Sequence, residues 1–158
     1  MLQVSVCGPR DCTDDDRRDA RTVGELLARR GATVICGGYS GVMAAAAAGA
    51  RAAGGTVVGV LSRADRAGAS PDLTVAIPTG MAEARNAIIV NAADVVIVVG
   101  GSWGTLSELA LAMRRGVPVV TLGGWRILDR HGVAVGGAAA ADSPEHAVEL
   151  ALAAATSP

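Results

Sequence analysis

The chain has 158 residues, of which 51% are hydrophobic and 2% aromatic, and its formal net charge is -1. This length suits one domain with a substantial buried core. Because the chain has no excess of basic residues and few rings on which bases could stack, we expect no nucleic-acid partner.

Lysine is absent from the sequence, which excludes a P-loop lysine and any cofactor bound as a lysine Schiff base. The apolar segment at the N-terminus is too short for a signal peptide, and no apolar run is long enough to cross a membrane. The cysteines lack zinc-ligand spacing and are expected to be reduced thiols; they are Cys7, Cys12 and Cys36. We therefore expect a cytoplasmic protein with no membrane contact and no metal site.

Strands and helices are expected to alternate along the chain. Short apolar runs between glycines or prolines predict strands at 2–7, 33–36, 56–61, 73–77, 95–99 and 117–122. Apolar residues at helical spacing predict helices at 14–30, 42–53, 80–92 and 105–115, and a last helix that Ser143 caps. Residues 62–71 are expected to form a mobile loop, and 123–141 an irregular segment with a short strand at 133–135.

This alternation predicts an α/β fold in which residues 1–158 form a single Rossmann-like nucleotide-binding domain. Its sheet is expected to be doubly wound and mainly parallel, with helices on both faces. In such sheets, ligands bind beyond the carboxyl ends of the strands. The turns that follow the strands are therefore the places to look for a site.

The central strand is expected at 95–99, and a glycine-rich turn follows it. Glycines end the strand and let the backbone approach a ligand closely. Thr105 and Glu108 fit a capping box, which predicts that a helix starts at Thr105 and leaves open whether Glu108 does more than cap it. A helix N-terminus suits a phosphate. We therefore predict phosphate or ligand binding by Gly100, Gly101, Ser102, Trp103, Gly104 and Thr105, with Trp103 either stacking on a base or filling space at the rim.

The other turns do not fit a dinucleotide fingerprint. The first offers only Gly8, and Cys36 stands where the second would need its leading glycine. Two glycine-rich turns in one sheet, at 37–41 and 100–104, instead indicate a mononucleotide or a similar phosphorylated ligand. We expect Gly8 and Gly38 to frame that ligand.

Arg85 falls inside an apolar arc of the predicted helix 80–92; the arc consists of Met81, Ala84, Ile88, Ile89 and Ala92. A buried guanidinium needs an anionic partner. That partner is either a carboxylate of the chain or a ligand, unless the side chain reaches solvent at the helix end. Asn86 beside it either contacts a base or ribose or lies on the surface.

With these residues the chain resembles the lonely-guy family of phosphoribohydrolases, and in particular its branch of molybdenum-cofactor carrier proteins. The signature G-G-x-G-T-x-x-E is matched by Gly100, Gly101, Gly104, Thr105 and Glu108, and a second glycine-turn pattern by residues 37–43, which include Gly41 and Met43. The resemblance covers nearly the whole chain. In the hydrolases an Arg-Lys pair precedes the central strand; here Arg85 is retained, Asn86 replaces the lysine, and Val99 replaces a proline.

The resemblance implies two principal functions. In the first, Arg85 and Glu108 are the catalytic pair of an N-glycosidase that cleaves a nucleoside 5′-monophosphate to a free base and ribose 5-phosphate without a cofactor. Glu108 would stabilise the positive charge at the anomeric carbon or orient water. We favour this interpretation because both residues are present. In the alternative, the chain is a carrier that binds molybdenum cofactor or a related phosphorylated ligand without turnover.

A nucleotide-sensing module is a third reading. The resemblance also implies a homodimer or homotetramer in which apolar helices pair between subunits.

Overall fold

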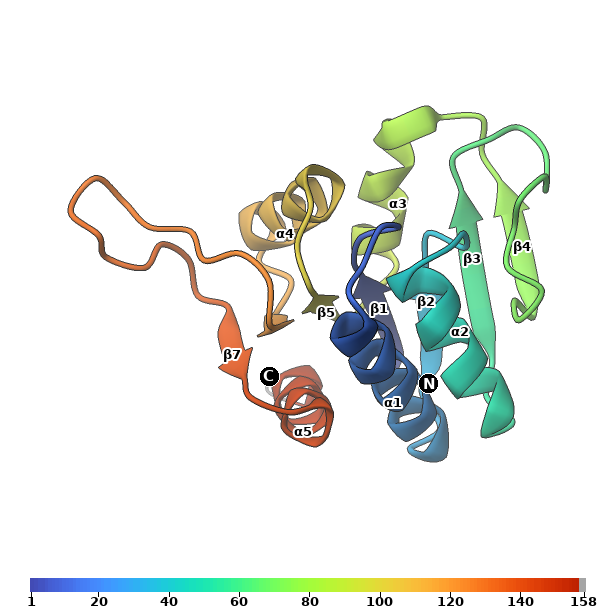
Figure 1. The fold of residues 1–158 in the computed structure, drawn as a ribbon, viewed down its shortest axis with the longest axis horizontal. Coiled ribbons are helices and arrows are strands. Elements are labelled where there is room, and N and C mark those ends of the chain that lie inside the picture. The colour runs from blue at the N-terminus through green and yellow to red at the C-terminus, as the bar shows by residue number, and fades with distance from the viewer. Residues whose placement is uncertain (157–158) are drawn as a thin grey trace.

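The computed structural model describes residues 1–156. Within them the chain forms a seven-stranded parallel sheet with the order β4-β3-β2-β1-β5-β6-β7 (Figure 1). The strands are β1 (Gln3–Cys7), β2 (Thr33–Cys36), β3 (Val57–Leu61), β4 (Val75–Pro78), β5 (Val95–Val99), β6 (Val119–Leu122) and β7 (Ala139–Ala141). The chain reverses its direction of travel across the sheet between β1 and β5, which makes this the switch point at which such folds bind ligands. The predicted α/β class is confirmed.

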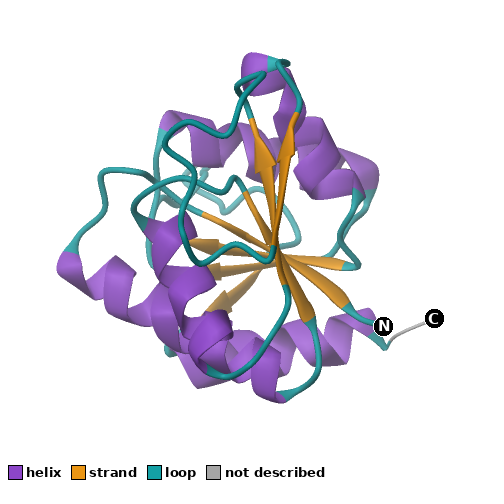
Figure 2. Cartoon of the chain, turned by 90° about the vertical axis from the view of Figure 1, so that its right-hand side faces the viewer, coloured by secondary structure: helices purple, strands orange, loops and turns teal. Residues whose placement is uncertain are grey.

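Helices cover both faces of the sheet (Figures 1 and 2). They are α1 (Asp14–Arg29), α2 (Val42–Ala52), the 3-10 helix η1 (Ala82–Arg85), α3 (Asn86–Asn91), α4 (Trp103–Arg115) and α5 (Pro144–Ala155). The larger core cluster joins α1, α2 and α5 to the sheet, and the smaller one joins α3 and α4 to it. The sheet is therefore doubly wound, as its sequence pattern predicts.

The central strand β5 is buried along its whole length. Its five consecutive β-branched residues favour this position, because a strand covered on both faces needs no polar alternation. On one side of the sheet, α1 and α2 approach closely through glycines. A Cβ added at Gly24 would lie 2.0 Å from the Ala46 carbonyl oxygen, and one at Gly49 would lie 1.9 Å from that of Arg21. Neither position has room for a side chain.

The predicted helix 80–92 is wrong at its start. The chain forms a 3-10 turn over Ala82–Arg85 and becomes α-helical only from Asn86. Ala82 has a positive φ of 48°, which breaks the winding that a single helix would give. In consequence Met81 and Ile88 of the expected apolar arc are exposed, while Asn86 is buried.

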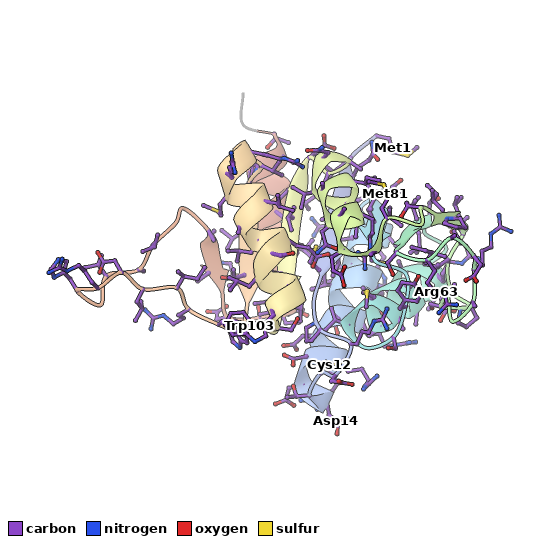
Figure 3. All side chains as sticks on the ribbon, turned by 90° about the horizontal axis from the view of Figure 1, so that it is seen from above. Met1, Cys12, Asp14, Arg63, Met81 and Trp103 are labelled. Carbon is purple, nitrogen blue, oxygen red and sulfur yellow. The ribbon has the colours of Figure 1, made fainter. Side chains whose placement is uncertain are left out.

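The predicted strand 133–135 is also wrong. Val135 N donates to the Ile127 carbonyl at 2.9 Å, and Leu128 forms an isolated bridge with Ala134. This makes residues 123–138 a hairpin that projects from the body as the long arm in Figures 1 and 3. The edge strand is β7 instead, and its three alanines carry none of the branched side chains that mark a strand. No helix within residues 1–156 is both long and apolar enough to cross a membrane.

Candidate functional site

A cleft of about 610 Å³ opens at the carboxyl ends of the strands, around the switch point. Its walls come from the turn after β1, the start of α2, the loop after β3, the η1–α3 segment and the first two turns of α4. The residues that line it are Gly8, Pro9, Arg10, Asp11, Met43, Ser62, Arg63, Ala82, Glu83, Arg85, Asn86, Ser102, Gly104, Thr105 and Glu108.

Helix α4 begins two residues earlier than its sequence suggests. Ser102 is the N-cap, and its Oγ accepts a hydrogen bond from the Thr105 backbone N–H at 3.2 Å. The predicted capping box of Thr105 and Glu108 is therefore wrong, because Thr105 already lies in the first turn. Glu108 stands in the second turn, where it has no capping role and lines the cleft.

Arg85 lies in the cleft with its side chain only 10% exposed, and its Nη1 is 3.7 Å from Glu108 Oε1. Neither Nε nor Nη1 of this guanidinium has a hydrogen-bond partner within residues 1–156. The group lies against Gly37, where an added Cβ would be 2.9 Å from both Nη1 and Nη2. The chain thus holds a buried cation and leaves part of its hydrogen-bonding capacity unused.

Burial raises the pKa of Glu108 from 4.5 to about 7, although the nearby Arg85 guanidinium and a hydrogen bond with the Cys7 thiol both lower it. Burial, and then the Glu108 charge, raises the pKa of Cys7 well above its usual value. Burial likewise raises the pKa of Cys36 to about 11. Near neutral pH both buried thiols are therefore protonated, and the Glu108 carboxyl in the cleft titrates in the same pH range.

Asn86 lines the cleft, but its amide is already engaged. Its Nδ2 donates to Ser107 Oγ at 2.8 Å, a hydrogen bond that joins α3 to α4. This is the position at which the resemblance to the hydrolases implies a lysine. Here the residue that follows Arg85 ties α3 to α4, the helix that carries Glu108.

The predicted glycines divide into three groups, two of which lie at or near the main cleft. Gly8 and Gly104 line the cleft together with Met43, and a Cβ at Gly8 would be 2.5 Å from the Val99 carbonyl oxygen. Gly38 and Gly41 lie behind it, with positive φ values of 77° and 67°. They permit the tight turn, and neither lines the cleft.

Gly100 and Gly101 lie under a smaller neighbouring pocket, which Ser102 and Thr105 also line. A Cβ at Gly101 would be 2.7 Å from Trp125 Cδ1. Trp103 is 78% exposed at the end of α4 (Figure 3), where its ring meets that of Trp125 edge to face with centroids 4.9 Å apart. It does not line the main cleft.

Sequence reasoning missed Arg10 and Arg63, which also line the cleft. The Arg10 guanidinium lies 4.5 Å from the centroid of the Tyr39 ring. Both arginines lie in the turns just after strands, Arg10 after β1 and Arg63 after β3, so their place at the carboxyl edge of the sheet is the signal that would have found them. Within residues 1–156 no group of three or more His, Cys, Asp or Glu side chains is arranged to hold a metal ion.

Comparisons with known proteins agree with this architecture. The model of the SLOG cluster4 family matches residues 1–148. An uncharacterised protein of Archaeoglobus fulgidus is 39% identical over 153 residues, which are 96% of this chain and 95% of that protein.

Solved structures are similar as well. The molybdenum cofactor binding protein of Rippkaea orientalis is 34% identical, with a TM-score of 0.86 over 96% of each chain. The molybdenum cofactor carrier protein of Chlamydomonas reinhardtii is 30% identical, with a TM-score of 0.86 over 99% of this chain and 100% of its own. These matches confirm the resemblance to the carrier-like branch. Because the family model matches nearly the whole chain, this protein belongs to the SLOG cluster4 family.

Proposed function

We propose that this protein is a carrier that binds molybdenum cofactor, or a closely related phosphorylated ligand, in the cleft and does not convert it. The observation that carries the proposal is the Arg85 guanidinium, which is buried and whose Nε and Nη1 have no hydrogen-bond partner within residues 1–156. A buried cation with unused donors is costly, and phosphate oxygens satisfy a guanidinium in two parallel hydrogen bonds. The cargo's phosphate is the group that Arg85 would bind.

The rest of the cleft suits such a ligand. The N-terminus of α4 adds the positive end of a helix dipole and backbone N–H groups, of which Ser102 caps only that of Thr105. Gly104 keeps this terminus open, since the nearest atom to an added Cβ would be Ser102 Oγ at 3.9 Å. The volume of about 610 Å³ lies in the range of small-molecule sites. The names of the Rippkaea and Chlamydomonas proteins support molybdenum cofactor as the ligand.

A phosphoribohydrolase is the second candidate, and the observation that favours it is the distance of 3.7 Å between Arg85 and Glu108 in one cleft. Two features make us prefer the carrier. Asn86 stands where the resemblance to the hydrolases implies a lysine, and it is held by Ser107 and brings no charge to the cleft. The Rippkaea and Chlamydomonas structures, which are similar over nearly the whole chain, are those of molybdenum cofactor proteins.

The test is the content of protein purified from a host that makes molybdenum cofactor. We expect wild type and Glu108→Gln to retain molybdenum and an oxidisable pterin in equal amounts, and Arg85→Gln to lose both. Arg114→Gln is the matched control, because it removes the same charge from an exposed position of α4. Pterin retained by Arg85→Gln at the wild-type level would refute the proposed site.

A parallel assay distinguishes the two candidates. Purified wild type is incubated with a panel of nucleoside 5′-monophosphates, and free base is measured by chromatography. The carrier proposal expects none. Base release by wild type that disappears in Glu108→Gln would establish the hydrolase instead.

A further inference from the structure

A cluster at the cleft is not used by the proposed function: Arg10, Tyr39 and Arg63. The three residues follow β1, β2 and β3, which are neighbours in the sheet. Arg10 and Arg63 line the same cleft as Arg85. Figure 3 labels Arg63 on the right of the view.

Tyr39 holds the cluster together. The residue is 5% exposed, and the face of its ring carries the Arg10 guanidinium at 4.5 Å. Its hydroxyl accepts hydrogen bonds from the Arg63 backbone N–H at 3.1 Å and from Ser62 Oγ at 3.3 Å. One buried phenol thus fixes the turn after β1 and the loop after β3 relative to each other.

The turn that carries Arg10 is also held by contacts with the start of α2. The Val42 backbone N–H donates to the Pro9 carbonyl at 3.0 Å, and a Cβ at Gly41 would be 2.2 Å from the Arg10 carbonyl oxygen. Because Gly41 has no side chain, the turn after β1 can pack directly on the turn after β2. Arg10 is held in place by its backbone as well as by the ring.

The charges around the cluster leave it able to bind an anion. Arg10 forms no ion pair within the part of the chain that the structure describes, and a guanidinium stacked on a ring keeps its N–H edge free. Arg63 Nε bonds Asp65 Oδ1 at 3.0 Å, but both side chains are more than half exposed, so this pair is weak. Asp11 and Glu83 also line the cleft and oppose an anion there. Neither of them pairs with Arg10.

We propose that Arg10 and Arg63, held by Tyr39, form a second anion subsite, so that the ligand of this cleft carries two separate anionic groups. One group binds at Arg85, which is where this inference rests on the proposed function, and the other binds at Arg10 and Arg63. The ligand class is a small molecule with two phosphate-like groups joined by an organic spacer. A ligand with one such group leaves the second subsite to water.

The probes are alkanediol bisphosphates with spacers of three to six carbons, each compared with the alkyl monophosphate of the same length. Binding to ligand-free protein is followed by calorimetry at about 0.15 M salt, where long-range attraction is largely screened. We expect the best bisphosphate to bind about tenfold more tightly than its monophosphate, which corresponds to about 1.4 kcal/mol.

The variants are Arg10→Met and Arg63→Gln, with Arg66→Gln as the control in the same loop, since Arg66 lines a different pocket. We expect the first two to bind the bisphosphate no better than the monophosphate, and Arg66→Gln to keep the tenfold preference. A wild type that binds both probes equally, or a preference that survives in both variants, overturns the second subsite. Loss of all binding in Arg85→Gln shows that the anion site at Arg85, on which the proposed function depends, stands in that case. Binding of the monophosphate at the wild-type level in Arg85→Gln refutes that site and the proposed function with it.

Discussion

Replacing Glu108 with glutamine is expected to stabilise the ligand-free protein at alkaline pH. The pKa of this carboxyl rises from 4.5 to about 7 on folding, mainly because it is buried. The native state therefore binds its proton more tightly than the unfolded chain does. The corresponding stability is fully present below about pH 4.5 and is lost as the pH rises through about 7.

The size of the effect follows from the same two values. A difference between 4.5 and about 7 corresponds to about 3 kcal/mol of unfolding free energy. Glutamine has nearly the same shape as the protonated acid and never ionises. We therefore expect Glu108→Gln to match wild type within about 1 kcal/mol near pH 4.5 and to exceed it by about 3 kcal/mol near pH 8.5.

The assay is urea unfolding of ligand-free protein at both pH values, followed by circular dichroism. Glu149→Gln is the control, because Glu149 is exposed on α5 and its replacement should change stability equally little at either pH. If Glu108→Gln is no more stable than wild type at the higher pH, the carboxyl is not destabilised by its burial. The account of the buried Glu108 carboxyl would then fail.

Three further outcomes are expected. Gly24→Ala should lower the unfolding free energy by about 1–3 kcal/mol in chemical denaturation, because α1 and α2 must separate to admit the methyl group; Gly137→Ala, whose methyl group would lie 3.7 Å from its nearest neighbour, is the control, and equal losses would contradict the packing. Gly37→Ala should weaken binding of the ligand, because the added methyl group would displace the Arg85 guanidinium. Unchanged binding in calorimetry would contradict the role of Arg85 in holding the ligand. Light scattering should give the mass of a homodimer or homotetramer, and a monomer at all concentrations would reject the predicted self-association.

The sequence predicts the sheet well where a run of residues is stable only as a buried strand. The run 95–99 is a buried central strand because branched apolar residues have no other stable place in this chain. Arg85 is predicted to need an anion, and the structure places it in the cleft beside Glu108. These two inferences depend on the cost of burying charge and on side-chain shape, which the sequence carries directly.

Other features depend on backbone geometry that residue types do not determine. Ser102 and Thr105 are both good N-caps, each with a polar residue three positions on, and only the fold selects Ser102. The positive φ of Ala82 turns the segment before α3, and this places Asn86 inside and Met81 outside. The cluster at Tyr39 joins three loops, and its contacts arise only once the sheet has assembled.

The same cleft combines features that are unfavourable for stability. It holds a guanidinium with unpartnered donors and a carboxyl whose ionisation costs free energy at neutral pH. Proteins retain such groups where a ligand compensates for them. The carrier proposal explains why the Nε and Nη1 of Arg85 lack hydrogen-bond partners although Glu108 lies within ion-pair distance.

The most direct test is a crystal structure of the protein purified with its natural ligand. We predict a phosphate group of that ligand at the N-terminus of α4, within hydrogen-bond distance of the Arg85 guanidinium. A ligand bound elsewhere, with no contact to this guanidinium, would contradict the account.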